Sequence, residues 1–161
     1  MSISLVKGQK IDLTKGNKGL AKVVFGLGWD TNRYDGNATF DLDVSAFLTD
    51  SNDKVTRDQD FVFYNQPNHP SGAIIYSGDN LTGEGQGDDE TFTVTLNKIP
   101  SNITKISFAA TIYDAEERLQ NFGMVDNSYI RAYNADTNEE LFKYELNEDF
   151  SLETGIIAGE L

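Results

Sequence analysis

The strongest constraint on the fold of this chain is a recurring alternation of apolar and polar side chains. Between residues 40 and 48, apolar residues alternate with Asp41, Asp43 and Ser45. A period of two places the two sets on opposite faces of a β-strand, one against a core and one toward solvent. The same pattern recurs in three further segments, at residues 92–96, 106–112 and 142–146. The sequence therefore predicts several half-buried strands.

Shorter apolar runs predict additional strands, at residues 22–27, 61–64, 73–76, 129–133 and 156–158. Clusters of Asp, Asn and Gly separate the runs, and only residues 114–120 have helical character, with acidic residues in the first turn. Many short strands with one or two short helices predict an all-β fold, an antiparallel β-sandwich. No linker or repeat interrupts the pattern, so we expect a single domain over residues 1–161.

Composition limits the partners and the location. The 161 residues include 13 lysines and arginines against 26 aspartates and glutamates, for a net charge of −13. This charge repels phosphate backbones and anionic lipid, so we expect neither nucleic-acid binding nor direct membrane insertion. No apolar run suits a transmembrane helix or a signal peptide, which predicts a cytoplasmic protein. The absence of cysteine excludes thiol chemistry and cysteine-based metal sites.

Positive charge is concentrated near the N-terminus. Residues 1–24 contain five lysines and a single acid, Asp12. We expect an N-terminal hairpin whose exposed lysines cover part of an acidic body, because lysine is common on exposed edge strands. The alternative is a docking patch for an acidic partner or for a neighbouring subunit.

Residues 77–90 form the segment with the clearest chemistry. They hold four glycines, no basic residue and five carboxylates, those of Asp79, Glu84, Asp88, Asp89 and Glu90, and Asn80 adds an amide oxygen. Ca²⁺ takes six to eight oxygen ligands from carboxylates, amides and backbone carbonyls. Glycines let the backbone curl so that such oxygens face one point. The segment predicts calcium sites in loops at one end of the sandwich, without the ligand spacing of an EF-hand.

A loop site of this kind needs ligands from elsewhere in the chain. Asp41 and Asp43 lie at i and i+2 of a predicted strand, so their carboxylates project from the same face. Two neighbouring carboxylates on a strand are costly without a cation or basic partners. Asp30, which follows Gly28 and Trp29, is a third candidate.

Other interpretations of the acidic segment remain open at the level of sequence. Charge runs commonly form solvated loops, and an unusual hydrogen-bonded turn would also use these residues. Mg²⁺ fits less well, because it retains water and rarely uses all-protein cages. A glycosidase-like carboxylate pair lacks an apolar pocket for its acid. The only histidine, His69, lies in the turn-like segment 68–72, and we expect it at the surface without a role. The alternative is a general base, which no accompanying catalytic motif supports.

Sequence motifs distributed along the chain indicate a family. They are residues 4–10 (SLVKGQK), 26–30 (GLGWD), 40–48 (FDLDVSAFL), 60–65 (DFVFYN), 78–85 (GDNLTGEG), 87–90 (GDDE), 112–118 (IYDAEER), 120–123 (QNFG) and 153–154 (ET). In these motifs and their order, the chain resembles the TerD-like tellurium-resistance and general-stress proteins of bacteria. The resemblance covers nearly the whole length.

The resemblance implies a TerD-like β-sandwich that binds two Ca²⁺ ions and acts in resistance to tellurite and other chemical stress. It also implies assembly with related stress proteins of the same family and with a membrane-embedded partner, and oligomers are compatible with it. One departure concerns the site directly, because Gln86 stands where the family usually has another acid.

Three functions compete on this basis. The first is a calcium-binding stress module that works as a binding or scaffolding protein through calcium-ordered acidic loops. The second is a metal-free structural interaction domain. The third is an enzyme acting on an oxyanion such as tellurite, which is disfavoured because its reduction needs electrons that a cysteine-free chain without a cofactor motif does not supply. We therefore expect a protein that is not an enzyme.

Overall fold

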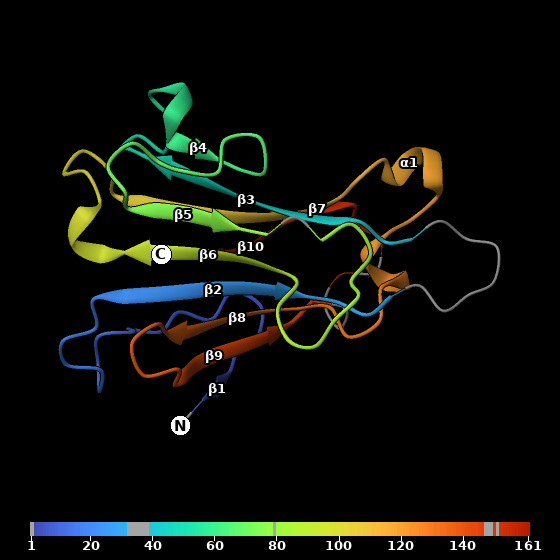
Figure 1. Cartoon of the computed structure of the whole chain (residues 1–161), viewed down its shortest axis with the longest axis horizontal. Coiled ribbons are helices and arrows are strands. Elements are labelled where there is room, and N and C mark those ends of the chain that lie inside the picture. The colour runs from blue at the N-terminus through green and yellow to red at the C-terminus, as the bar shows by residue number, and fades with distance from the viewer. Residues whose placement is uncertain (1, 32–38, 79, 147–149, 151) are drawn as a thin grey trace.

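The computed structural model describes residues 2–31, 39–78, 80–146, 150 and 152–161. Over these residues two β-sheets pack face to face (Figure 1). The six-stranded sheet has the order β1-β9-β8-β2-β6-β5, and the four-stranded sheet has the order β10-β7-β3-β4. The predicted mainly-β architecture with few helices is confirmed.

The strand bounds follow the predicted apolar segments closely. The six-stranded sheet contains β1 (Ile3–Ser4), β2 (Lys22–Gly28), β5 (Ile74–Ser77), β6 (Glu90–Thr95), β8 (Tyr129–Asn134) and β9 (Glu140–Glu145). The four-stranded sheet contains β3 (Leu42–Thr49), β4 (Phe61–Val62), β7 (Lys105–Ile112) and β10 (Gly155–Glu160). The helical elements are α1 (Ala115–Arg118), η1 (Asp58–Asp60), η2 (Leu96–Lys98) and η3 (Phe122–Met124).

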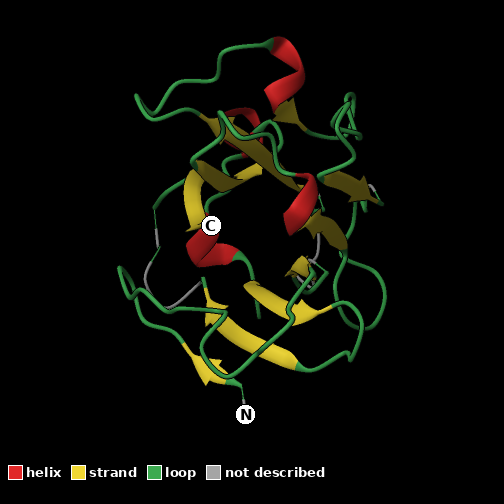
Figure 2. Ribbon diagram, turned by 90° about the vertical axis from the view of Figure 1, so that its left-hand side faces the viewer, coloured by secondary structure: helices red, strands yellow, loops and turns green. Residues whose placement is uncertain are grey.

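The alternation seen in the sequence becomes alternating burial in the strands. In β3, Leu42 and Val44 are buried and Asp43 between them is partly exposed. The two inner faces meet through aromatic rings, since Phe25 of β2 stacks on Phe108 of β7 with ring centroids 4.2 Å apart. Figure 2, turned by 90°, shows strands of the two layers on either side of this interior.

The two sheets differ in width. β3 contacts β6, and β4 contacts β5, so the sheets are aligned along that side. Since β2 also lies over β7 through the Phe25–Phe108 stack, the two extra strands of the larger sheet, β9 and β1, project past β10. Residues 5–20 lie along this side, where Leu5, Leu13 and Leu20 pack against the core.

The N-terminal region differs from its prediction. β1 pairs in parallel with β9, whereas we expected a hairpin within residues 1–24. β2 pairs with β6 and β8 instead of with the chain that precedes it. The reason is that residues 5–20 form consecutive turns, in which Gly8 and Gly16 have positive φ angles of 78° and 97°, and no returning strand develops.

The single α-helix is shorter than the predicted segment 114–120. It begins after Asp114 and ends before Leu119, and both of these residues have left-handed backbone conformations, with φ of 49° and 54°. A left-handed residue cannot continue an α-helix, so one turn remains. The end of the helix is therefore set at Leu119.

His69 is buried, which corrects its predicted position at the surface. Its Nε2 lies 3.0 Å from Asp60 Oδ1, and its Nδ1 lies 2.8 Å from Ser71 Oγ and 3.1 Å from the Ser71 amide. Because an ionised carboxylate only accepts hydrogen bonds, Nε2 carries the proton and donates to Asp60. The turn-like sequence was interpreted correctly as a turn, but its histidine points inward to a buried acid.

Candidate metal centre

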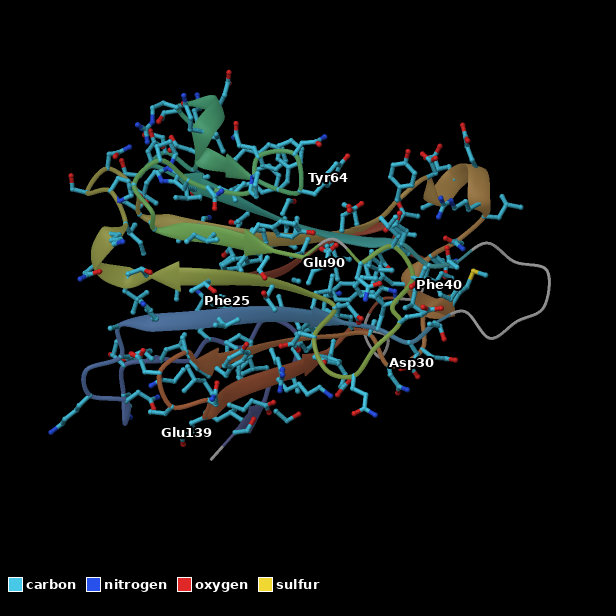
Figure 3. All side chains as sticks on the ribbon, viewed as in Figure 1. Phe25, Asp30, Phe40, Tyr64, Glu90 and Glu139 are labelled. Carbon is cyan, nitrogen blue, oxygen red and sulfur yellow. The ribbon has the colours of Figure 1, made fainter. Side chains whose placement is uncertain are left out.

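The acidic segment meets the end of β2 at one end of the sandwich. The antiparallel register pairs Leu27 with Glu90, and the Asp89 amide donates to the Leu27 carbonyl at 2.8 Å. Residues 80–90 therefore lie beside Trp29 and Asp30, which follow β2. In Figure 3 Asp30 lies toward this end of the molecule.

Asp89 is fixed from two directions. Its Oδ2 accepts from the Trp29 amide at 2.9 Å, and its Oδ1 accepts from Asn80 Nδ2 at 2.7 Å. Burial raises the pKa of the Asp89 carboxyl group; the Trp29 bond lowers it, and the charges of Asp88 and Asp30 raise it again. The negative charge at Asp89 is therefore disfavoured by its surroundings, as expected for carboxylates brought together.

Asp88 forms an ion pair with an arginine of β8. Arg131 Nε donates to Asp88 Oδ1 at 2.7 Å, and Arg131 Nη2 donates to Oδ2 at 3.0 Å, a bidentate arrangement. The Tyr129 hydroxyl donates to Oδ1 at 3.0 Å. The Asp88 side chain is only 5% exposed, so its charge is compensated inside the protein by a residue of β8.

Asn80 organises the glycine-rich loop. Its Oδ1 accepts from the amides of Thr82 at 3.1 Å and Gly83 at 3.0 Å, and its Nδ2 donates to the Glu84 carbonyl at 3.1 Å. In this arrangement the amide oxygen of Asn80 caps the turn. Glu84 itself is exposed at the loop surface.

Glu90 lies inside the sandwich. Its side chain is fully buried, and Oε2 accepts from the Val44 amide of β3 at 2.8 Å. β3 pairs with the short β4 only at Ala46 and Phe47, so the Val44 amide lies beyond the reach of that partner strand. The Glu90 carboxylate therefore accepts the hydrogen bond that β4 cannot accept from the Val44 amide, and it links β6 of one sheet to β3 of the other.

Asp41 and Asp43 belong to the other sheet. Asp41 is buried just before β3, and its carbonyl accepts from the Tyr113 amide at 2.8 Å, whereas Asp43 is partly exposed within β3. Asp79 lies outside the described residues. The candidate ligands thus divide into a group around the end of β2, formed by Asp30, Asn80, Asp88 and Asp89, and a pair on the opposite sheet.

Arg131 and Tyr129 are site residues that the sequence patterns did not reveal. A signal for them exists in β2, where Gly26 and Gly28 interrupt an otherwise apolar strand. A Cβ atom at Gly26 would overlap the Asp88 carboxylate, and a Cβ atom at Gly28 would overlap the Tyr129 ring. Glycine inside a strand marks a close approach of another group, and here it makes room for this ion pair.

A polar cavity of about 570 Å³ opens beside Asp30. Asn127 Nδ2 donates to Asp30 Oδ2 at 2.8 Å, and Lys143 and Glu145, which also line the cavity, form an ion pair of 2.7 Å. Gln86 is part of the lining. Carboxylate, ammonium and amide groups therefore line this cavity next to the acidic loop.

The candidate ligand atoms in this region are carboxylate, amide and backbone carbonyl oxygens, which suit a hard cation such as Ca²⁺. Within the part of the chain that the structure describes, no group of three or more Asp, Glu, His or Cys side chains is arranged to hold a metal ion. A calcium ion would therefore need loop carbonyls, Asp79 or a shift of side chains to complete its coordination. The residues fit the chemistry of calcium without presenting a finished coordination sphere.

The comparisons with known proteins identify the family. A family model for the TerD domain matches residues 1–161. The chain belongs to the TerD family. It is 61% identical to general stress protein 16U of Bacillus subtilis (strain 168) and 47% identical to tellurium resistance protein TerD of Serratia marcescens. Each match covers the whole of this chain and 83% of the relative.

A solved structure supports this TerD fold. The crystal structure of a homologue of the telluride resistance protein TerD from Streptomyces coelicolor A3(2) superposes with a TM-score of 0.70 at 21% identity. The match covers 85% of this chain and 78% of that one. Among the described residues, we find no helix with the length and apolar character needed to cross a membrane.

Proposed function

We propose that this TerD domain is a calcium-binding module of the bacterial stress response that works by binding other proteins. The family membership and the relatives named for general stress and tellurium resistance support the biological setting. Within that setting the calcium ion orders the acidic loop at the end of β2, and the ordered loop forms a docking surface. The protein acts in the cytoplasm.

The observation that carries the calcium proposal is the position of the Asp89 carboxylate, which accepts from the Trp29 amide and feels the negative charges of both Asp88 and Asp30. Arg131 compensates Asp88, but Asp89 is partly buried beside a second acid, Asp30. A cation placed between Asp30 and Asp89 relieves this repulsion. Oxygen ligands and a flexible glycine-rich loop favour Ca²⁺, because Mg²⁺ demands a stricter octahedral geometry.

Two ions are proposed, in line with the family resemblance. Asp30 and Asp89, with Asp88, Asn80, Glu84 and loop carbonyls in support, would hold one ion. Asp41 and Asp43, with Asp79 and Glu90, would contribute to a second. When bound, calcium supplies positive charge that lets these carboxylates remain close together; the chain's own part is to position the oxygens and to exclude water behind them.

Binding and not catalysis is the proposed activity. The chain has no cysteine to act as a nucleophile, and its only histidine is buried against Asp60, where a substrate cannot reach it. The partners proposed are related stress proteins of the same family and a membrane-embedded protein. A metal-free interaction domain is the second candidate, favoured by the Asp88–Arg131 pair, which shows how part of the acidic charge is compensated internally.

Isothermal titration with CaCl₂ after chelator treatment tests the proposal. The parent should bind calcium, and Asp89→Asn should lower the affinity about tenfold or more, because it removes one charged oxygen ligand. Asp30→Asn should act in the same direction. Circular dichroism checks that each variant is folded.

Asp136→Asn is the matched control. This substitution makes the same chemical change in an exposed turn between β8 and β9. The turn lies far from the acidic loop, because the neighbouring Asn134 pairs with Val23 at the opposite end of β2. It should leave calcium affinity unchanged. An equal loss in all three variants would indicate a diffuse charge effect, and no binding to the parent would favour the metal-free domain.

A further inference from the structure

A large cavity lies on the side of the sandwich away from the acidic loop. Its volume is about 970 Å³, at the upper end of the range for pockets that hold small organic ligands. β9 and β1 project past β10 here, and residues 5–14 close over the gap. The larger sheet, β10 and the N-terminal turns therefore surround a partly open space that the core side chains of the described residues do not fill.

The walls of this cavity are apolar. The inner faces of β2, β8 and β9 contribute Phe25, Ile130, Phe142 and Tyr144, all buried. The N-terminal turns contribute partly buried leucines, and Phe150 closes another side. A ligand body that fills this space must be apolar, because the walls offer few hydrogen-bonding groups.

The rim of the cavity is basic on its N-terminal side. Lys7 and Lys10 are exposed lining residues, and the Lys7 ammonium lies 4.7 Å from the centroid of the Phe150 ring, at the cavity wall. The other charged lining residues are Asp12, Lys105 and Glu160. Lys105 pairs with Glu160 at 3.4 Å and also with Asp53, which is not a lining residue, at 2.8 Å.

Asp12 does not cancel the two lysines. Its Oδ1 accepts from the Thr14 amide at 2.9 Å and from the Thr14 hydroxyl at 2.6 Å, which favours the ionised form, so Asp12 offsets one of the two positive charges and leaves the other. Because Glu160 is balanced by Lys105, the charged lining side chains sum to one net positive charge, in a protein whose net charge is −13. This basic rim on an acidic protein is a local complement for one anionic group.

We propose that the cavity binds a medium-chain fatty acid, with its alkyl chain against Phe25, Phe142 and Phe150 and its carboxylate at Lys7 and Lys10. An apolar interior with a cationic entrance selects an amphiphile that has one anionic head. The site is independent of calcium and of the proposed docking surface, because β2 separates the cavity from the acidic loop along its length.

Calorimetric titration with octanoate, decanoate and dodecanoate, each below its micellar concentration, tests the site. The affinity should rise about fourfold for each added methylene, which corresponds to about 0.8 kcal/mol of burial per CH₂. Dodecylamine, with the same chain and the opposite charge, should bind at least about tenfold more weakly than dodecanoate. Absent dodecanoate binding, or affinity independent of chain length, would overturn the proposal.

Charge-reversal variants locate the head group. Lys7→Glu/Lys10→Glu should weaken dodecanoate binding about tenfold or more and leave dodecanol binding nearly unchanged. Lys15→Glu/Lys18→Glu is the matched control, because it makes the same change in the same segment with residues that do not line the cavity. Equal weakening by both pairs would contradict a carboxylate held at Lys7 and Lys10.

Leu13→Trp provides a second measurement that does not depend on charge. The added indole occupies part of the cavity, since Leu13 is one of its lining residues. The affinity gain from decanoate to dodecanoate should then shrink or disappear, while octanoate binds nearly as before. Unchanged chain-length dependence in a folded Leu13→Trp protein would show that the alkyl chain lies elsewhere.

Discussion

Asp60 forms a buried charge network with residues that precede and follow it in the chain. Arg57 donates to both carboxylate oxygens, at 2.7 and 3.2 Å, and His69 Nε2 donates at 3.0 Å. Burial alone would raise the pKa of Asp60, but the bonds from Arg57 and His69 outweigh it and lower the pKa to about 2. A sequence pattern records the charge of Asp60 and the turn around His69, but not the direction in which either side chain points.

Asp60→Asn should destabilise the protein by about 1–3 kcal/mol, because it leaves Arg57 and His69 with an uncharged acceptor. The sign of the pH effect follows from the lowered pKa. Ionised Asp60 contributes stability above about pH 4, near its unfolded value of 3.8, and that contribution disappears as the pH falls toward 2. Urea unfolding of parent and variant between pH 2 and 6 measures it.

The difference in unfolding free energy between parent and Asp60→Asn should therefore narrow as the pH falls from 4 to 2. Asp58→Asn is a suitable control, since Asp58 is exposed in the same 3-10 turn. A difference that is constant over this range would mean that the ionisation of Asp60 does not stabilise the fold.

At the scale of elements, the periodicity of the sequence predicted where the strands lie, but it did not predict which strands pair. Alternation predicted the strands that became β3, β6, β7 and β9, because burial on one face is a local property of the sequence. The parallel pairing of β1 with β9 joins residues more than a hundred positions apart, and no local pattern encodes it. The same limit applies to the site, where Arg131 neutralises Asp88 from 43 residues away.

Gly26 in β2 tests this long-range contact. Gly26→Ala should cost about 1–3 kcal/mol, because the new methyl group overlaps the Asp88 carboxylate and displaces it from Arg131. In an Asp88→Ala background the same change should cost much less, since the obstructing group is gone. Chemical unfolding of the four proteins of this double-mutant cycle measures the coupling.

Gly159→Ala is the control for the glycine substitution. Gly159 lies in β10, and a Cβ atom there meets nothing within 4 Å. It should have little effect in either background. If Gly26→Ala costs the same with and without Asp88, the close approach of the carboxylate is not what requires glycine in β2.

At the scale of the whole molecule, the acidic loop and the apolar cavity lie at opposite ends of β2. The acidic loop lies at the Gly28 end, and the apolar cavity with its lysine rim lies toward the Lys22 end. The sequence predicted the acidic end and the basic N-terminal segment, because both are runs of like residues. It did not predict the cavity, which arises from the unequal widths of two sheets.

Thermal unfolding with and without calcium is the most direct test of calcium binding by the folded protein. A ligand that binds only the native state adds about 2.7 kcal/mol at a concentration of 100 Kd, which for a domain of this size raises Tm by about 5–10 °C. After chelator treatment, calcium at 100 Kd should produce this rise, and an equal concentration of MgCl₂ should produce a much smaller one. An unchanged Tm in millimolar calcium, or an equal rise with magnesium, would contradict a calcium-specific site at the acidic loop.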